Sequence, residues 1–232
     1  MGDHMWEICS CQKDDEIYPK GFREIKSAPK LLYYKGDITI CNDMVIAVIG
    51  KRDASARYLE IARRIGRILA QKGITVLNGL ALGIDTAALE GVVELNGKAI
   101  AVMPGGLDEI YPKKNQELAE RILKNGGCLI SEYPQGTKPQ RYSFVQRDRI
   151  QAMLSSKVLI VDAEKDGGTM QTVDYAVKFS KPLGCFAEKE GIQSPEGNQL
   201  LIETRKACPI GDKAALMEFL NRQDYYQMSL FG

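Results

Sequence analysis

Residues 79–90 read GLALGIDTAALE, a turn with glycines at 79 and 83 that separates an apolar run at 74–77 (ITVL) from a helical pattern. Glycine lets the backbone take a positive φ or come close to a ligand. The helix that follows would point its free N–H groups back at the turn, and such a helix N-terminus binds anions. The stretch therefore predicts a strand, a tight turn and a helix, with a phosphate-type ligand at the turn.

A second strand end carries positive charge. The apolar run at 45–49 (VIAVI) leads directly into Gly50, Lys51 and Arg52. A guanidinium can bond two phosphate oxygens at once, and a position at a strand end restricts where the side chain can point. We therefore expect Arg52 to contact phosphate. The alternative is an arginine that is only solvated in a loop.

Short apolar runs alternate with helical patterns from residue 45 onward. The expected strands are 45–49, 74–77, 99–103, 128–131, 158–162 and 182–186, and the expected helices are 58–72, 86–96, 115–125, 147–155 and 169–179. Such alternation implies right-handed crossovers and a sheet covered by helices on both faces. The sequence thus predicts an α/β fold of three layers, in which a mainly parallel sheet lies between two layers of helices.

Glycine-rich turns follow four of the expected strands, at 50–52, 79–83, 104–106 and 167–169. In parallel α/β sheets, ligands bind beyond the carboxyl ends of the strands. We therefore expect these turns to meet at one ligand-binding rim. The alternative is that the glycines serve only the tight turns of an α/β fold.

Two arginines in the helical pattern at 147–155 are further candidates. Arg147 and Arg149 are two residues apart, so on a helix they point about 200° away from each other. Both can reach one ligand only if they lie in the first turn of the helix. We expect Arg147 to bind the ligand, and Arg149 either to join it or to pair with Asp148 or Asp85.

The remaining candidates each have two interpretations. Phe144 is either a platform on which a base stacks or a core anchor ahead of the helix. Thr169, which follows Gly168, either caps the helix at 169–179 or donates to phosphate. Asp85, close to the start of a helix, is expected to be structural.

The composition narrows the class of protein. The chain is 44% hydrophobic and 26% charged with a net charge of +1, so a polyanion site would have to be a local patch. Cys9 and Cys11 have C-x-C rather than zinc-site spacing, and His4 is the one histidine, so we expect no metal and no cofactor. No apolar run approaches the roughly 20 residues of a membrane span, and no signal peptide is visible, which predicts a cytoplasmic protein.

The chain divides into three expected parts. Residues 1–44 are a turn-rich lead-in that should pack on the core, residues 45–212 carry the α/β domain, and residues 213–232 form a short helix and a tail.

The tail contains a short motif of its own. Residues 227–231 (QMSLF) resemble the peptide that binds the bacterial sliding clamp, whose pattern is Gln-x-x-Leu-Phe. By this resemblance, Gln227 would set the orientation, and Leu230 and Phe231 would fill an apolar pocket of the clamp. The alternative is that Leu230 and Phe231 pack on the chain's own core.

Motifs spread over residues 17–210 resemble those of the DNA-processing protein A family (DprA, also called Smf). In chain order they are Ile17–Pro19, Phe22–Ile25, Leu32–Gly36, Gly50–Arg52, Gly79–Asp85, Gly105–Asp108, Tyr111–Lys113, Ser131–Pro134, Phe144, Arg147–Ile150, Gly197–Asn198 and Leu201–Ile202. The chain departs from the family pattern at Lys51 and Gly167, where the family has serine, at Ala88 (histidine) and at Asp148 (asparagine).

This resemblance implies an extended Rossmann-like domain, without the additional domains of many relatives. It also implies a homodimer that binds and protects single-stranded DNA, loads a RecA-type recombinase onto it and catalyses no reaction, in recombination or natural transformation. The residues expected to hold DNA or phosphate are Gly50, Lys51, Arg52, Gly79, Gly83, Gly105, Phe144, Arg147, Arg149, Gly168 and Thr169.

A second function class stays open. Phosphoribohydrolases of the cytokinin-activating kind also carry a Pro-Gly-Gly turn, here at 104–106, so a nucleotide sensor or nucleotide-cleaving enzyme is the alternative. Those enzymes continue with Gly-Thr, whereas this chain continues with Leu107 and Asp108. Glu109 and Glu132 remain conceivable acids for such a reaction.

Overall fold

A computed structural model describes residues 6–222 of the chain. The strands and helices follow in the order β1 (Cys9–Gln12), α1 (Lys20–Arg23), β2 (Leu31–Gly36), η1 (Ile38–Asn42), β3 (Val45–Ile49), α2 (Ala56–Gln71), β4 (Thr75–Asn78), α3 (Ile84–Val93), β5 (Ala99–Val102), η2 (Lys113–Asn115), α4 (Gln116–Lys124), β6 (Cys128–Ser131), α5 (Arg141–Leu154), β7 (Lys157–Ile160), α6 (Thr169–Lys178), β8 (Leu183–Phe186), α7 (Glu196–Glu203), β9 (Cys208–Ile210) and α8 (Lys213–Asn221).

The apolar runs of the sequence form the centre of one sheet. Within residues 6–222, nine strands pair in the order β1-β2-β6-β5-β4-β3-β7-β8-β9, and the six expected runs are β3 to β8. The six pairings along β6-β5-β4-β3-β7-β8-β9 are parallel, whereas the pairings of β1 with β2 and of β2 with β6 are antiparallel. The prediction of an α/β fold with a mainly parallel sheet is confirmed.

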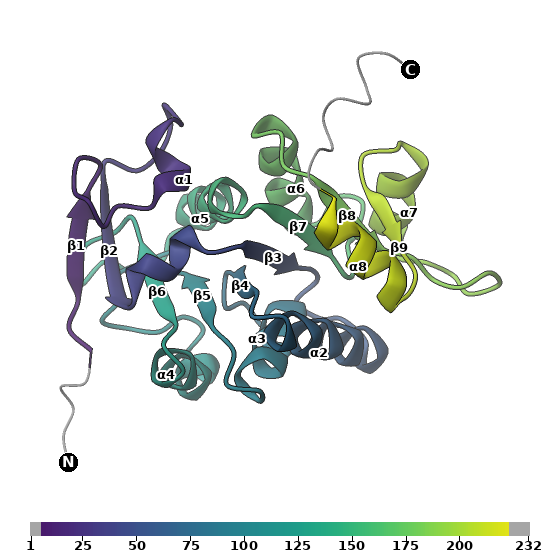
Figure 1. Cartoon of the computed structure of the whole chain (residues 1–232), viewed down its shortest axis with the longest axis horizontal. Helices are drawn as coiled ribbons and strands as arrows, with labels where there is room; N and C mark the ends of the chain where they lie inside the picture. The colour runs from purple at the N-terminus through teal and green to yellow at the C-terminus, as the bar shows by residue number, and fades with distance from the viewer. Residues whose placement is uncertain (1–5, 223–232) are drawn as a thin grey trace.

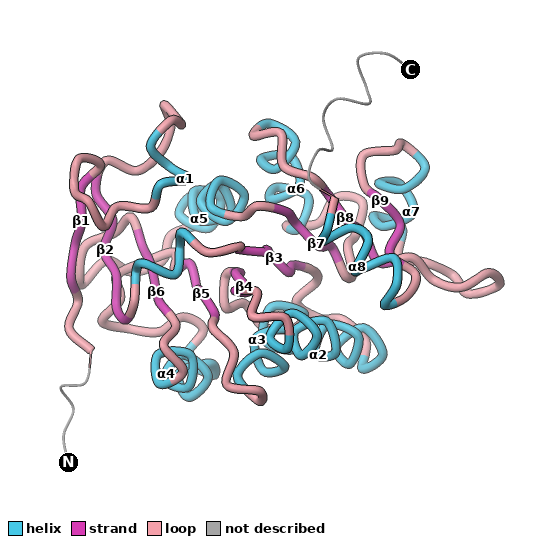
Figure 2. The backbone as a smooth tube through the Cα atoms, in the orientation of Figure 1, coloured by secondary structure: helices cyan, strands magenta, loops and turns pink. Residues whose placement is uncertain are grey.

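Helices cover both faces of this sheet, as Figures 1 and 2 show. Successive side chains of a strand point to opposite faces. Val45, Ala47 and Ile49 therefore share a buried cluster with residues of α1, α5, α6 and α7, whereas Ile46 and Val48 share one with residues of α2, α3, α4 and α8. Since both faces are covered, the central strands are apolar at nearly every position instead of alternating with polar residues.

The N-terminal lead-in contains more regular structure than its turn-rich sequence suggests. Strand β1 pairs with β2, and β2 pairs with β6, so these two strands extend the sheet beyond its parallel part. Tyr18 and Phe22 are fully buried beside them, and the Tyr18 hydroxyl donates to the Pro29 carbonyl oxygen.

Helix α5 begins earlier than its apolar spacing predicts, at Arg141 instead of 147. Its start is fixed by a reciprocal cap, in which Ser143 Oγ accepts from the backbone N–H of Gln140 over 2.9 Å. The usual capping box has Ser or Thr at the N-cap and Glu or Gln three residues later. Here the two residue types are exchanged, with Gln140 at the N-cap and Ser143 three residues later. As a result, Arg147 and Arg149 both lie beyond the first turn of α5.

The order of the strands locates a crevice. From β3 the chain continues to β4 on one side, while the other neighbour of β3 is β7, which comes much later in the sequence. The loops after β3 and β7 therefore leave the sheet in opposite directions, and such switch points are where open α/β sheets bind ligands. Among the described residues, no helix is long and apolar enough to cross a membrane.

Candidate nucleic-acid interface

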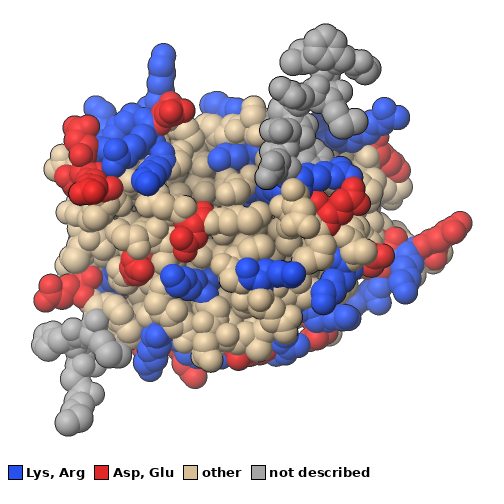
Figure 3. Space-filling view, in the orientation of Figure 1, with Lys and Arg blue, Asp and Glu red and all other residues tan. Residues whose placement is uncertain are grey.

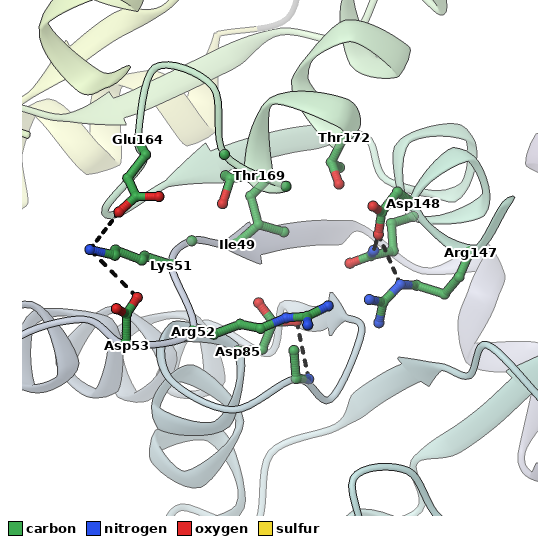
Figure 4. A pocket seen from close by; sticks show the side chains of 15 residues that line it. Ile49, Lys51, Arg52, Asp53, Asp85, Arg147, Asp148, Glu164, Thr169 and Thr172 are labelled. Atoms are coloured by element: carbon green, nitrogen blue, oxygen red, sulfur yellow. Dashed lines mark hydrogen bonds and ion pairs between the residues drawn. The ribbon is translucent and has the colours of Figure 1, made fainter. Parts of the chain in front are cut away.

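A cleft of about 350 Å³ opens at the carboxyl ends of β3 and β7 (Figure 4). Its walls come from residues 49–53 at the end of β3 and just after it, Ala81 and Asp85 at the α3 turn, Arg147, Asp148 and Gln151 of α5, Glu164 and 167–168 after β7, and Thr169 and Thr172 of α6. The structure thus brings Gly50, Lys51, Arg52, Arg147, Gly168 and Thr169 together, as the sequence predicts.

The segment after β3 is clamped between two other elements. The Lys51 backbone N–H donates to the Asp162 carbonyl oxygen over 2.8 Å, and the Lys51 carbonyl accepts from the Ile84 N–H over 3.1 Å. A Cβ at position 50 would lie 2.7 Å from Ile84 and 2.9 Å from the Asp162 carbonyl oxygen, so the close approach requires Gly50. These contacts fix where Arg52 leaves the backbone.

Arg52 is the available cation of the cleft. Its side chain is exposed and extends between the two ends of the cleft (Figure 4). Its guanidinium carbon lies 5.5 Å from the centre of the Phe144 ring. Within residues 6–222 it forms no salt bridge, so its donors are open to a phosphate.

Lys51 lines the cleft but is paired. Its Nζ lies 2.6 Å from Glu164 Oε1 and 3.5 Å from Asp53 Oδ1 at one end of the cleft (Figure 4). The hydrogen bond to Glu164 raises the pKa of Lys51, so the amine stays charged. A phosphate would have to compete with these two carboxylates, and Glu164 was not among the residues that the sequence pointed to.

The turn at the start of α3 does not offer its amides to a ligand, contrary to the expectation from its sequence. The Asp85 carboxylate accepts from the backbone N–H groups of Gly79 over 3.0 Å and Ala81 over 3.4 Å. The chain's own carboxylate therefore takes the place that an external anion would occupy. Burial raises the pKa of Asp85 to about 6, against the opposing effects of Arg147 and these two amides. Asp85 is structural, as the sequence suggested.

The two glycines of this turn are required for packing. A Cβ at Gly79 would overlap Nη1 of Arg147, which donates to the Gly79 carbonyl oxygen over 2.6 Å. Gly83 has φ of +82° and rests against the carbonyl groups of Lys51 and Arg52. Gly83 is therefore behind the cleft wall and supports the segment that carries Arg52.

Arg147 and Asp148 form a pair in the wall opposite Lys51. Arg147 Nε donates to Asp148 Oδ1 over 2.8 Å, and the two side chains are 5% and 14% exposed. Burial raises the pKa of Asp148, while the adjacent guanidinium opposes that rise. Arg147 therefore lines the cleft as expected, but its hydrogen bonds go to the protein and its charge is largely balanced.

Arg149 is directed away from the cleft. The prediction that Arg149 belongs to the ligand-binding site is therefore wrong. Its Nη2 donates to Glu132 Oε1 over 2.5 Å, and its Nη1 donates to the Ser27 carbonyl oxygen. The sequence predicts an ion pair as one alternative for Arg149, but its partner is neither Asp148 nor Asp85. Since both arginines lie beyond the first helical turn, they point to different sides of α5.

Phe144 lines a smaller hollow next to the cleft. This hollow is also lined by Gly79, Tyr111 and Arg147, and the rings of Phe144 and Tyr111 meet edge to face with centroids 5.5 Å apart. Arg52 and Arg147 both lie over the Phe144 ring. Tyr111 is 46% exposed, and sequence reasoning missed it although it belongs to one of the quoted motifs.

The other expected residues divide between the cleft and its surroundings. Gly168 and Thr169 are in the cleft wall, and Thr169 is the first residue of α6, whose N-cap position is occupied by Gly168. The proposed capping role of Thr169 is therefore wrong. Gly105 rests against Thr137 and Pro139 and is not part of the cleft.

The described residues contain no metal-binding cluster, and they do not include the tail motif. No group of His, Cys, Asp and Glu side chains in residues 6–222 is arranged to hold a metal ion. Gln227, Leu230 and Phe231 are outside the described residues. On the face shown in Figure 3, basic and acidic side chains are interspersed.

Comparisons with known proteins agree over nearly all of the described chain. A family model for DNA recombination-mediator protein A matches residues 10–221. Protein Smf of Synechocystis sp. is 36% identical over 188 residues, which are 79% of this chain and 47% of that protein. The chain spans about half the length of the curated relatives that it matches.

Solved structures show the same fold. DNA processing protein A (DprA) of Streptococcus pneumoniae superposes with a TM-score of 0.82 at 29% identity, covering 91% of this chain and 74% of that one. DNA processing protein A of Helicobacter pylori, whose structure concerns its single-stranded DNA binding mode, gives 0.80 at 29% identity and covers 95% and 97%. With the family model, these similarities show that the chain belongs to the DNA recombination-mediator protein A (DprA/Smf) family and has its Rossmann-like domain.

Proposed function

We propose that this protein binds single-stranded DNA in the cleft after β3 and β7 and acts as a recombination mediator without catalysing a reaction. The observation that carries the proposal is Arg52, an exposed guanidinium that the cleft holds beside the Phe144 ring at the switch point of the sheet. A cation for the backbone next to aromatic rings for bases is the combination that single-strand binding uses. The Helicobacter pylori relative, with its single-stranded DNA binding mode, supports the same ligand.

The direct test is fluorescence anisotropy of a labelled oligo-dT with the purified protein over a salt series. Binding should weaken as salt rises, because phosphate contacts release counterions. Duplex DNA and ATP serve as competitors. The proposal requires that oligo-dT bind and that neither competitor displace it at equal concentration; absence of oligo-dT binding would refute it.

The geometry gives less support to the enzyme alternative. Glu132 is paired with Arg149, and Glu109 belongs to a separate groove beside α4, so neither conceivable acid lines the cleft. Displacement of oligo-dT by micromolar mononucleotide would favour a nucleotide sensor over a DNA-binding protein.

Protection of single strands and loading of a RecA-type recombinase are the roles we propose for the DNA complex, by membership of the family. We also propose that the protein is cytoplasmic and that it forms a homodimer. Nuclease-protection and recombinase-filament assays on DNA coated with a single-strand binding protein test the first two roles, and light scattering gives the mass of the particle.

We also propose that the tail motif docks on the bacterial sliding clamp. The last described helix is firmly anchored, because Lys157 Nζ donates to the carbonyl oxygens of Phe219, Leu220 and Arg222 over 2.5, 2.8 and 2.7 Å. Deletion of Leu230 and Phe231 leaves this anchor intact. The deletion should abolish binding to the clamp and leave oligo-dT affinity unchanged; undiminished clamp binding would contradict the docking role.

A further inference from the structure

The cleft wall formed by α5 has hydrogen-bond acceptors that the protein leaves unused. Asp148 receives hydrogen bonds from Arg147 Nε and Gln151 Nε2, each over 2.8 Å, and both end on the same oxygen, Oδ1. Oδ2 is left for another donor. Asp148 lines the cleft directly, so that donor can come from a ligand.

Gln151 provides an independent second sign of a ligand. Its side chain lines the same cleft and is 2% exposed, yet its Oε1 has no hydrogen-bond partner among residues 6–222. The orientation of the amide is set by Asp148, because the carboxylate requires the NH₂ end to face it. An unpartnered buried acceptor is unfavourable, so the wall is suited to a group that brings hydrogen-bond donors.

Two sets of donors next to this wall are already used within the protein. Arg147 uses Nε on Asp148 and Nη1 on the Gly79 carbonyl oxygen. The backbone amides of Gly79 and Ala81 are taken by Asp85. Asp148 Oδ2 and Gln151 Oε1 are acceptors, so the ligand group that fits against them presents donors, while Arg52 stays open to an acceptor such as a phosphate oxygen.

Among the bases, guanine matches this requirement. Its Watson–Crick edge has two adjacent donors, N1–H and the N2 amino group. Cytosine and adenine each place a ring-nitrogen acceptor beside their amino group, and the N3–H of thymine stands between two carbonyls. In a single strand these edges are free to be read. The acceptor atoms of adenine, cytosine and thymine named above would each repel the carboxylate oxygen of Asp148.

We infer that the cleft selects a guanine base of single-stranded DNA, with Asp148 and Gln151 accepting hydrogen bonds from its Watson–Crick edge. The inference rests on the proposed DNA-binding function and adds base selectivity to it. The phosphate next to this guanine would lie toward Arg52, which extends along the cleft between the Lys51 end and the Asp148 end (Figure 4).

The test compares oligo-dT with the same oligonucleotide carrying one central guanine, adenine, cytosine or hypoxanthine. Two good hydrogen bonds predict that the guanine oligonucleotide binds about tenfold tighter than oligo-dT. Hypoxanthine keeps N1–H and lacks the N2 amino group, so its affinity should fall between the two. Free dGMP is a competitor that distinguishes a base within DNA from a free nucleotide.

The key variant is Asp148→Asn, which keeps the size of the side chain. Arg147 still requires an oxygen at the Oδ1 position, so the new NH₂ group would stand where Oδ2 was and face the donors of guanine. The guanine preference should disappear, while oligo-dT still binds. Glu164→Gln is the matched carboxylate-to-amide control at the other end of the cleft, and it should leave the ratio between guanine and thymine unchanged.

The outcomes separate the two proposals. Equal binding of all five oligonucleotides by the wild-type protein, or a guanine preference that survives Asp148→Asn, would overturn the base selectivity and leave the DNA-binding function standing. No binding of any oligonucleotide would overturn both. Displacement by dGMP at micromolar concentration, with no competition by oligo-dT, would replace DNA with a free guanine nucleotide as the ligand.

Discussion

Arg147 Nη1 donates a hydrogen bond to the Gly79 carbonyl oxygen over 2.6 Å, at the place where a side chain at position 79 would have to stand. The absence of a Cβ at residue 79 and the buried guanidinium at residue 147 therefore depend on each other, although 68 positions separate them in the sequence. The pair joins the end of β4 to α5 and shapes the wall between the cleft and the Phe144 hollow.

Gly79→Ala should destabilise the protein strongly. The new methyl group would overlap the Arg147 guanidinium, and overpacking of this kind costs about 1–3 kcal/mol in the free energy of unfolding. Urea unfolding measures the change. Gly21→Ala is the matched control, because no atom lies within 4 Å of a Cβ built there and Gly21 is exposed. Equal stability of both variants would contradict the described packing.

Arg52→Ala should weaken oligo-dT binding and reduce the slope of log affinity against log salt by about 1, as expected for the loss of one phosphate contact. The reason is that Arg52 is exposed and forms no salt bridge with any residue in the range 6–222. Arg64→Ala removes the same charge from an exposed position on α2, away from the cleft, and should leave the slope intact. Anisotropy titrations of both variants at several salt concentrations measure the two slopes, and equal slopes would contradict a phosphate contact by Arg52.

Glu164→Gln should tighten oligo-dT binding. The substitution removes the closer of the two carboxylates on Lys51, which frees the amine for phosphate. Both side chains are partly exposed, so the expected gain is modest, about twofold to fivefold at low salt, the range of a surface ion pair. The gain should shrink as salt rises. A loss of affinity would mean that Glu164 serves the ligand in another way.

Binding of oligo-dT should strengthen as the pH falls through about 6, the pKa to which burial raises Asp85. Protonation removes a negative charge beside Arg147, so the cleft becomes more positive toward phosphate. Asp85→Asn should flatten this dependence. Carboxyl carbon NMR identifies the titrating residue, which separates Asp85 from Asp148.

The same titration affects stability with the opposite sign from most carboxylates. The pKa of Asp85 is higher in the folded than in the unfolded chain, so folding favours the protonated form. The stabilisation by this group is complete below about pH 4, near the ordinary aspartate value, and is lost as the pH rises through 6. Urea midpoints that rise from pH 4 to pH 7 only in the wild-type protein, and not in Asp85→Asn, would contradict the assignment.

The strands could be predicted from the sequence because burial on both faces leaves a simple signature. The run VIAVI at 45–49 is apolar throughout, and its alternate residues fill the two cores. The start of α5 could not be predicted, since its cap reverses the usual order of residues at Gln140 and Ser143. Strands β1 and β2 are stabilised by pairing at the sheet edge, which local sequence does not reveal.

At the site, the sequence located the strand ends correctly, but it could not show which charged side chains already pair with other residues of the protein. GLALGIDTAALE has the composition of an anion-binding turn, and only the structure shows that Asp85 satisfies its amides. Lys51 and Arg52 are adjacent in sequence, yet one is paired with Glu164 and the other is available. The spacing of Arg147 and Arg149 did predict that they diverge, but their partners come from distant segments.

The most direct test of the DNA-binding cleft is photo-crosslinking of an oligonucleotide that contains 5-iododeoxyuridine, followed by mass spectrometry of the attached peptide. The modified base crosslinks to aromatic rings on which it stacks. We predict crosslinks in the peptides of Phe144 and Tyr111, with a reduced yield in Arg52→Ala. Crosslinks confined to another aromatic pair, such as Tyr175 and Phe179 at the C-terminal end of α6, would contradict the proposed position of the DNA.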